Sequence, residues 1–559
     1  MVLACVLAAF GVGIGVGLLS SHGSSHGNSS ANGGHGSTSQ TSAPKPIAPV
    51  IKAPVETDAY KNIVPAPVEA TAATSEPFVL DASTTVAYPS GSSAAKDVAD
   101  YVAALFRPAT GFALQTTVGA VGKAGSSSSG IRLALTAPDA RLGTEGYQLQ
   151  VTNRQITISA PTSAGLFYGV QTLRQLLPTA IDGTVKRPYN AWPVPAGQVL
   201  DAARFGYRGA GLDVTRHFFT VAQVERYIDE ISRYKIDYLH LHLSDDQGWR
   251  IAIDGWPKLT TVGAATQVGG GTGGFYTQDE YRRLVAYAQS RYVTLIPEID
   301  VPGHVTAALA SYPQLGCSGK PTQVFTGIDV GFSSLCATKP NTTTFLHDVF
   351  TQLAALTPGP YVAIGGDEAK ATSTADYARV VTEAAADVRA AGKVPWGWQE
   401  ITATPVGTPS VAGYWDIGPV QASVQRAAAA GTRLVLMPAN HAYLDQKYSG
   451  ATTLGLDWAG FVDVQDAYDW DPATYVPGVA STSVLGVEGD LWTETITSPA
   501  DIDYMVFPRL PAIAELGWSA PATHDWAAFR LRLAAQAPRW KAAGIGFYAS
   551  PEVPWPQGQ

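Results

Sequence analysis

Residues 361–370 read YVAIGGDEAK, an apolar β-type run that ends in two glycines and then two adjacent carboxylates, Asp367 and Glu368. From about Arg204 onward the same pattern recurs: an apolar strand with polar or Gly residues at its end, followed by a helix-like stretch. The eight strands are YRGAGLDV, DYLHLHLSDD, YVTLIPEID, PYVAIGGDE, KVPWGWQE, SVAGYW, TRLVLMP and VLGVEGDLW. Parallel strands that are buried on both faces are apolar throughout, as these are until their last residues. Eight such units predict an α/β fold of the (β/α)8 type, a TIM barrel.

The chain upstream of the barrel divides into three further segments. Residues 1–19 are apolar and uncharged, which predicts an export signal or a retained membrane anchor. Residues 20–76 are rich in Ser, Gly, Ala, Pro and Thr and predict a flexible linker. Residues 77–203 alternate short β-type runs with two helical stretches and predict a small α+β supporting domain, which leaves residues 204–559 for the barrel. We therefore expect a secreted protein, tethered to a membrane if residues 1–19 are kept.

Composition excludes one class of partner. The formal net charge is -9 and no cluster of Lys and Arg is present, whereas binding to nucleic acid draws on such clusters. A length of 559 residues agrees with two or three domains. We expect no nucleic-acid partner.

Cysteine usage predicts one covalent cross-link. Of the 3 cysteines, Cys5 lies in the apolar N-terminal segment, which leaves Cys317 and Cys336. Two cysteines in an exported protein indicate a disulfide between them. Two free buried thiols are the alternative.

The polar ends of the barrel strands mark the expected site, because chemistry in such barrels takes place at the carboxyl ends of the strands. Tryptophan is common there, and its flat face stacks on sugar rings, although a buried core Trp is the plainer reading for any single one. The polar and aromatic residues at these ends are Asp213, Arg216, Asp245, Asp246, Glu298, Asp300, His304, Asp367, Glu368, Trp398, Trp415, Asn440, Tyr443, Asp445, Trp492 and Glu494.

Asp367 and Glu368 pose a chemical problem as immediate neighbours. Side chains alternate along a strand, so both reach one cavity only if Gly365 and Gly366 relax the backbone. Even then they approach a bound sugar from the same side, without the carboxylate on the opposite face that a double displacement requires. The nucleophile must therefore come from elsewhere, and a 2-acetamido group on the substrate can supply it.

At this point the chain resembles family 20 of the glycoside hydrolases, the β-N-acetylhexosaminidases of bacterial secreted type. The resemblance covers residues 77–559. It rests on the ordered motifs YRGAGLDVTRHFF, HLHLSDDQGWR, IPEIDVPGH, GGDE, WGWQE, YLDQKY and GVEGDLWTE.

The resemblance implies roles for the carboxylates and for one tyrosine. Glu368 is expected to protonate the leaving oxygen and then to activate water. Asp367 is expected to accept the acetamido N–H, to aim the carbonyl oxygen at the anomeric carbon and to stabilise the oxazolinium intermediate, while Tyr443 binds that carbonyl oxygen. His304 is expected to lie against the acid, with Asp245 fixing its tautomer.

The resemblance also implies a substrate, an oligosaccharide with a terminal 2-acetamido sugar, and no cofactor or metal. Trp398, Trp415 and Trp492 are expected to enclose the acetamido methyl, and Trp458 to stack on the sugar or its leaving partner. The outer hydroxyls of the terminal sugar are expected to bind Arg216, Asp445 and Glu494. Closing the site in this way predicts an exo-acting enzyme.

Several other polar residues are assigned to structure. Asp246, Glu298 and Asp300 are expected to form ion pairs or to accept hydrogen bonds at the barrel rim. Glu488 is expected to be an internal partner for Arg or Lys, and His217 to pack.

Two other classes of protein remain open. The pair His240 and His242, with His304 after another strand, permits a metal-dependent barrel hydrolase, although metal sites also want further ligands and a satisfied outer shell. Chelator-insensitive activity would exclude it. A catalytically silent glycan-binding protein would keep the tryptophans, but it has no use for Asp367, Glu368 and Tyr443 together.

Overall fold

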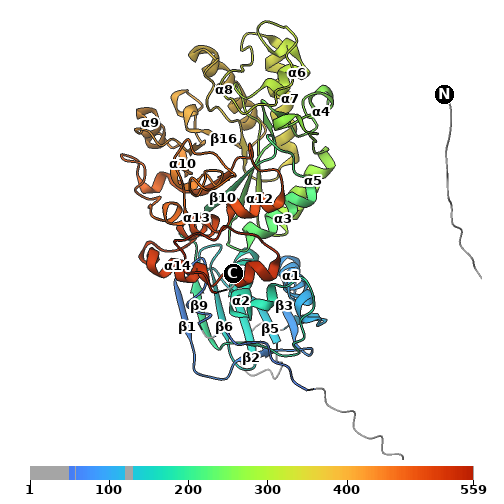
Figure 1. Cartoon of the computed structure of the whole chain (residues 1–559), viewed down its shortest axis with the longest axis vertical. Coiled ribbons are helices and arrows are strands. Elements are labelled where there is room, and N and C mark those ends of the chain that lie inside the picture. Colours follow the sequence, from blue (N-terminus) through green and yellow to red (C-terminus); the bar gives the residue numbers. More distant parts are fainter. Residues whose placement is uncertain (1–48, 57, 120–129, 558–559) are drawn as a thin grey trace, which may run out of the picture. The chain divides into compact units, whose positions relative to one another are not determined.

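The structure, a computed structural model, describes residues 49–56, 58–119 and 130–557. It confirms a barrel of eight parallel strands preceded by an α+β domain (Figure 1). The barrel closes in chain order through β10 (Tyr207–Asp213), β11 (Tyr238–His242), β14 (Thr294–Glu298), β15 (Tyr361–Ala363), β16 (Val394–Trp398), β17 (Val411–Tyr414), β18 (Arg433–Leu436) and β19 (Val484–Leu491). Each predicted strand is present, because each segment is apolar enough to be buried on both faces.

Helices alternate with these strands and supply the outer layer of the barrel. The apolar stripes of those that connect the strands pack on the barrel, which leaves polar residues at the strand ends free for a site. The helices are α3 (Val221–Ser232), α4 (Lys258–Thr261), α5 (Gln278–Gln289), α6 (Thr306–Ser311), α7 (Pro340–Leu356), α8 (Thr374–Ala390), α9 (Ala422–Ala429), α10 (Ala439–Ala442), α11 (Val464–Tyr468), α12 (Pro499–Val506), α13 (Arg509–Trp518), α14 (Trp526–Ala534) and α15 (Ala537–Ala543). The last two helices follow β19, and α15 packs against the 3₁₀ helix η1 (Thr179–Asp182) of the supporting domain.

The supporting domain is a seven-stranded mixed sheet with two helices, α1 (Ser93–Thr110) and α2 (Ser163–Leu176). Its central strands alternate buried and exposed residues, so one sheet face is covered and the other meets solvent. In sheet order the strands are β1 (Glu69–Ala72), β9 (Gly197–Asp201), β6 (Tyr147–Val151), β7 (Gln155–Ala160), β5 (Gly130–Leu135), β3 (Thr85–Pro89) and β4 (Thr116–Gly119). A separate two-stranded sheet pairs β2 (Phe78–Leu80) with β8 (Trp192–Val194).

The predicted linker is too long at its C-terminal end. Residues 69–72 form β1, which pairs antiparallel with β9, and Ile63 and Val64 are fully buried. The Val64 amide donates to Gln175 Oε1 at 3.0 Å. These few apolar residues suffice to order the segment, although its composition is that of a linker, and the compact unit begins at Val50. Residues 1–19 and most of the predicted linker lie outside the described residues.

Within the part of the chain that the structure describes, no helix has both the length and the apolar composition to cross a bilayer.

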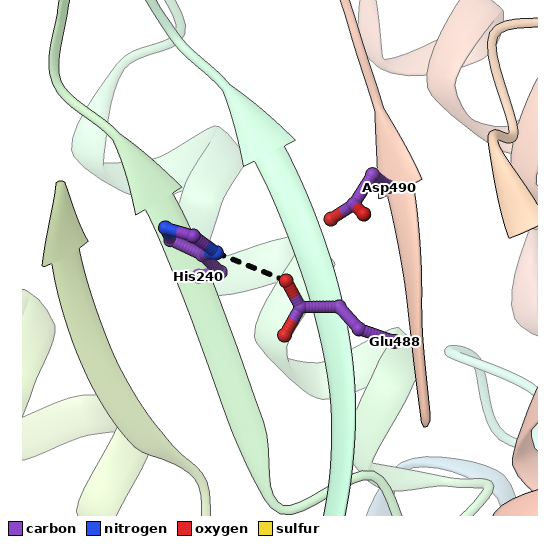
Figure 2. Close-up of side chains that lie close together, drawn as sticks. All are labelled: His240, Glu488 and Asp490. Atoms are coloured by element: carbon purple, nitrogen blue, oxygen red, sulfur yellow. Dashed lines mark hydrogen bonds and ion pairs between the residues drawn. The ribbon is translucent and has the colours of Figure 1, made fainter. Parts of the chain in front are cut away.

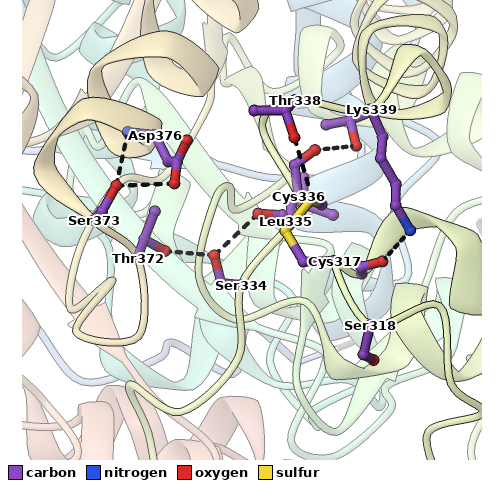
Figure 3. Close-up of a disulfide and its surroundings, with 12 residues drawn as sticks. Cys317, Ser318, Ser334, Leu335, Cys336, Thr338, Lys339, Thr372, Ser373 and Asp376 are labelled. Atoms are coloured by element: carbon purple, nitrogen blue, oxygen red, sulfur yellow. Dashed lines mark hydrogen bonds between the residues drawn. A yellow bond between two sulfur atoms is a disulfide. The ribbon is translucent and has the colours of Figure 1, made fainter.

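The predicted disulfide between Cys317 and Cys336 is present (Figure 3). It closes the irregular segment between α6 and α7. Ser334 within this segment lies 2.7 Å, Oγ to Oγ1, from Thr372, which follows β15. The disulfide-closed loop is therefore tied to the segment that carries the two adjacent carboxylates.

A buried ion pair joins the supporting domain to the barrel. Lys235 Nζ lies 2.7 Å from Asp201 Oδ2, and both side chains are fully buried. Asp201 also accepts from Tyr147 Oη at 2.7 Å and from Trp518 Nε1 at 3.0 Å. All the hydrogen-bonding capacity of this carboxylate is thus committed to groups from both domains.

Replacing Lys235 by Met is expected to lower the free energy of unfolding by about 3–5 kcal/mol, because it leaves Asp201 buried without its cation. A denaturant titration would measure this loss. Lys61→Met is the control: its pair with Asp58 is exposed on both sides, so little change is expected. Equal effects of the two substitutions would contradict a structural role for the buried pair.

Candidate active site

A cavity of about 270 Å³ lies at the carboxyl ends of the barrel strands. Of the twelve residues predicted to act on or bind a sugar, eleven line it. These are Arg216, Asp245, His304, Asp367, Glu368, Trp415, Tyr443, Asp445, Trp458, Trp492 and Glu494. Its lining combines charged side chains with the rings of Trp415, Tyr443, Trp458 and Trp492, which is the composition of a small-molecule site that fixes the orientation of its ligand.

The turn after β15 presents Asp367 and Glu368 to this cavity together. Gly365 and Gly366 have φ of 65° and 102°, and a Cβ on Gly365 would lie 1.9 Å from Asp300 Oδ1. Only glycine fits this conformation and this close contact. Glu368 itself is at φ 44°. The left-handed turn is what lets two neighbouring side chains enter one cavity.

Asp367 is held on one oxygen and unpaired on the other. Its Oδ2 lies 3.5 Å from His304 Nε2, at ion-pair distance. Its Oδ1 is buried and has no hydrogen-bond partner among the described residues. Burial raises the pKa of Asp367, and the His304 cation opposes that shift. One oxygen of this carboxylate is therefore available to a ligand N–H.

His304 faces Asp367 rather than Glu368, which differs from the expectation. Burial disfavours the His304 cation, but Asp245 and Asp367 outweigh burial and raise its pKa to about 10. Asp245 Oδ1 lies 3.1 Å from His304 Nδ1, as the predicted supporting pair requires. Glu368 instead pairs with Lys370, whose Nζ lies 3.0 Å from Glu368 Oε1. The left-handed turn decides which of the two carboxylates meets the imidazole. The alternation of side chains along a strand does not predict this outcome, because the turn interrupts the strand.

Asp300 is a site residue that the sequence analysis assigned to structure. It hydrogen-bonds Asp367 through its side chain and accepts from the Gly366 amide at 3.0 Å. Burial and the neighbouring Asp367 carboxylate raise the pKa of Asp300 well above its usual range. Two adjacent carboxyls cannot both ionise cheaply, so Asp300 is the protonated donor and Asp367 the acceptor. The signal in the sequence was its position two residues after Glu298, on the same face of the chain.

Asp245 gathers three cations around one carboxylate. Besides His304, its Oδ2 lies 2.8 Å from Arg216 Nη2 and 2.9 Å from His242 Nε2. These partners outweigh burial and hold the pKa of Asp245 well below its usual range. Glu298 and Asp245 likewise raise the pKa of His242 to about 9, against the effect of burial. His242, which also lines the cavity, was considered only as a metal ligand.

The end of the cavity that is expected to bind the outer hydroxyls of the sugar holds further unpaired polar atoms. Asp445 Oδ1, Glu494 Oε2 and Arg216 Nε are buried without a hydrogen-bond partner in the described ranges. Burial and the Glu494 charge raise the pKa of Asp445 well above its usual range. Buried polar groups are normally paired, so this end is built to receive hydroxyl groups.

The aromatic walls are arranged as expected, with one exception. Trp415 and Tyr443 lie 6.4 Å apart, ring centroid to centroid, at 17°, and Trp458 meets both edge-on. Trp458 is 50% exposed and stands at the mouth. Trp398 lies behind Trp492, with ring centroids 5.8 Å apart, and lines a small adjoining cavity that shares His242 and Trp492 with the main one. Its Nε1 donates to Glu298 Oε1 at 2.8 Å, which holds it one layer deeper in the barrel.

Beneath the cavity, His240, Glu488 and Asp490 converge in the barrel interior (Figure 2). Glu488 reaches across β10 to His240, with Oε1 2.9 Å from Nδ1. A Cβ on Gly209 or Gly211 of β10 would lie about 2 Å from these carboxylates (2.1 and 2.0 Å), so glycines make the space. Glu488 also accepts from Tyr207. Its partners are therefore His and Tyr, and the predicted Arg or Lys partner is wrong.

The histidines proposed as metal ligands are paired with carboxylates. Glu298 Oε2 lies 3.1 Å from His240 Nε2 and 2.8 Å from His242 Nδ1. Glu298 and Glu488 raise the pKa of His240 well above its usual range, against burial. A protonated imidazole cannot bind a metal, so a metal ion here would have to displace these protons. Glu298 is an ion-pair partner as predicted, but in the interior rather than at the rim.

The remaining structural assignments agree with the contacts. Asp246 Oδ1 accepts from the amide and hydroxyl of Thr306 at 2.8 and 2.5 Å and from Ser333 Oγ at 2.6 Å. His217 packs against Thr493, with Nδ1 2.6 Å from its carbonyl oxygen.

Comparison with known proteins agrees with this geometry. The family model for the catalytic domain of glycosyl hydrolase family 20 matches residues 205–521, and the model for domain 2 of the same family matches residues 60–202. The chain is similar to a "Beta-N-acetylhexosaminidase" of Cellulomonas fimi, at 47% identity over 77% of this chain and 86% of the relative.

Two solved structures are similar over almost their whole length. One is the GH20 β-N-acetylhexosaminidase from Streptomyces coelicolor A3(2), at 46% identity and a TM-score of 0.85, covering 89% of this chain and 99% of that one. The other is a mutant β-hexosaminidase of Streptomyces plicatus in complex with its product GlcNAc, at 48% identity and a TM-score of 0.86, covering 90% and 99%. The chain belongs to glycosyl hydrolase family 20 and is a glycoside hydrolase of the β-N-acetylhexosaminidase type.

Proposed function

We propose that the protein is an exo-acting enzyme that removes terminal non-reducing N-acetylglucosamine or N-acetylgalactosamine by a retaining, substrate-assisted mechanism. The oxygen of the substrate's own acetamido group attacks the anomeric carbon. The bond to the leaving oxygen breaks as Glu368 gives it a proton, and an oxazolinium ion forms. Water then opens this ion, with Glu368 taking the proton back.

One observation carries this proposal: the buried, unpaired Oδ1 of Asp367. A carboxylate in this state accepts an amide N–H, which turns the acetamido oxygen toward the anomeric carbon. Asp300 hydrogen-bonds the Asp367 carboxylate and His304 lies at ion-pair distance from its Oδ2, so its orientation is set before substrate binds. The negative charge of Asp367 also stabilises the cationic intermediate.

The cavity end opposite the mouth supports exo action, because buried polar atoms line it. Asp445 and Arg216 are buried there, Glu494 is partly buried with a buried Oε2, and together they offer two acceptors and one donor to the hydroxyls of a terminal sugar. The open side is the mouth beside Trp458, where a leaving sugar can extend into solvent. The glycan-binding alternative is separated by an aryl N-acetyl-β-glucosaminide, since a pure binder releases no phenol.

The stereochemistry of the first product tests the mechanism. We expect NMR to show the β-anomer of the released sugar before mutarotation, because two displacements at one carbon retain configuration. A thiazoline mimic of the intermediate is expected to inhibit tightly. Initial release of the α-anomer would contradict the mechanism, even if the thiazoline inhibits tightly.

Export is a further proposal, based on the apolar segment 1–19 and on the disulfide. A disulfide persists in oxidising compartments. Fractionating cells and sequencing the N-terminus of the mature protein would show whether this segment is cleaved or kept as a tether. Recovery of the protein with its cysteines reduced from the cytosol would contradict export.

A further inference from the structure

The segment that follows β16 contacts both the aromatic wall and the catalytic turn, and the mechanism above does not use it. This segment is the short 3₁₀ helix η4 (Gln399–Ala403). Its Ile401 packs against the turn after β15, where a Cβ on Gly366 would lie 2.8 Å from Ile401 Cγ2. The helix is thus seated on the backbone that positions Asp367.

The first two residues of η4 hold Trp415 at both its backbone and its ring. Gln399 is buried, and its Oε1 accepts from the amides of Trp415 and Asp416, both at 3.2 Å. Glu400 Oε2 accepts from the indole Nε1 of Trp415 at 3.3 Å. The backbone at Trp415 and Asp416 and the indole N–H are thus all held by two adjacent residues, which limits the tilt of the indole plane.

We infer that Gln399 and Glu400 are positioning residues that set the Trp415 wall and thereby determine the size of the 2-acylamino group that the site accepts. This inference rests on the proposed function, because it assigns the Trp415 wall to the acyl group. Neither residue lines the cavity, so both act through Trp415.

The physical reason is the steep cost of misfit in an apolar pocket. One methylene group changes binding in such a pocket by roughly 1–3 kcal/mol, or about 10–200-fold in kcat/KM. A wall that is free to tilt would admit a larger acyl group and hold the acetamido group less firmly. A wall held at its amide, at its indole N–H and at the amide of the next residue discriminates between the two.

Glu400 also provides a spectroscopic handle. Burial, with a further contribution from the Asp367 charge, raises the pKa of Glu400 to about 8. The titratable groups that face it are Asp367 and Glu368 from the turn after β15, Tyr377 from α8 and Tyr443 at the end of α10. The carboxyl hydrogen-bonded to the indole therefore changes charge in an accessible pH range.

Acyl selectivity is the first test, measured as kcat/KM for an aryl N-acetyl-β-glucosaminide divided by that for its N-propionyl analogue. Glu400→Gln keeps an acceptor for the indole N–H and is expected to keep the wild-type ratio. Glu400→Leu and Gln399→Leu remove acceptors and are expected to lower the ratio about tenfold. An unchanged ratio in both Leu variants would overturn the inference.

Tryptophan fluorescence is the second test, and it needs no substrate. Wild-type emission is expected to show a step near pH 8 that Glu400→Gln and Trp415→Phe each abolish. Glu230→Gln is the matched control: Glu230 is buried on α3, away from the cavity, and burial with Asp503 raises its pKa also to about 8. Persistence of the step in Glu400→Gln would overturn the inference even if a Leu variant failed to fold.

Different results would contradict the proposed function and the inference about Gln399 and Glu400. If the wild-type enzyme hydrolyses a glucoside with a bare 2-hydroxyl as fast as the acetamido sugar, the proposed function fails, whereas the fluorescence step still tests the contact with Trp415. If the acetamido group is required but no variant of Gln399 or Glu400 changes the acyl ratio, only the present inference fails.

Discussion

Replacing Glu368 by Gln is expected to lower kcat by about 10²- to 10⁴-fold for substrates whose leaving group needs a proton, because Gln cannot supply one. Substrates with an activated leaving group, such as 2,4-dinitrophenol, are expected to lose much less in kcat/KM, since the first bond breaks without acid help. KM for the poor substrates should change little, because the fold and the sugar contacts are kept. Steady-state kinetics on a series of aryl glycosides of increasing phenol pKa would measure this.

The decisive quantity is the slope of log(kcat/KM) against the pKa of the leaving phenol. Wild-type rates should depend weakly on the pKa of the phenol and variant rates steeply. Glu383→Gln, on α8 and outside the cavity, serves as a control with the same change of side chain. An equal loss for activated and poor leaving groups would mean that Glu368 is not the acid.

Asp367→Asn is expected to reduce kcat on the order of 10²- to 10³-fold for acetamido substrates. The variant loses the negative charge that stabilises the intermediate. Its amide also offers one acceptor oxygen in place of two, so Asp300 and the acetamido N–H compete for that oxygen. Activity should be compared with that on a glucoside that carries a 2-hydroxyl, for which wild type and variant should be similarly slow.

Asp246→Asn is the control for this change. Asp246 is fully buried and is hydrogen-bonded to the neutral groups of Thr306 and Ser333, so the amide oxygen can replace the carboxylate oxygen. We expect near wild-type kcat. Full activity of Asp367→Asn on acetamido substrates would leave the substrate-assisted scheme without its orienting group.

Residues at the cavity show what local pattern can predict. His240 and His242 stand out in the sequence as a pair of histidines at a strand end, and in the structure both pair with Glu298 inside the barrel. The two glycines before Asp367 indicated a relaxed backbone at this point, and Gly365 and Gly366 do have positive φ, which glycine adopts without steric cost. Such features depend on neighbours in sequence, so they can be read from it.

Contacts across the barrel were beyond this reasoning. Glu488 was given a cationic partner of the wrong type because its neighbour β10 lies some 280 residues away and pairs with it only when the barrel closes. Trp398 was placed in the cavity because its residue type suits a sugar site, but its bond to Glu298 holds it deeper. Asp300 was assigned to structure because its raised pKa arises from burial and from the Asp367 carboxylate, and both depend on the assembled site.

The sequence by itself determined the eight-stranded barrel, the supporting domain, the disulfide and the set of side chains that meet at the strand ends, because periodicity, turn residues and strand polarity are local properties. Only the tertiary structure decided that His304 faces Asp367 and that Asp300 forms a hydrogen bond with Asp367. It also decided that Gln399 and Glu400 hold Trp415 and that the folded unit begins at Val50. Those outcomes depend on which groups become neighbours in a low-dielectric interior, and charge and hydrogen bonding there are properties of the assembled site rather than of any one residue.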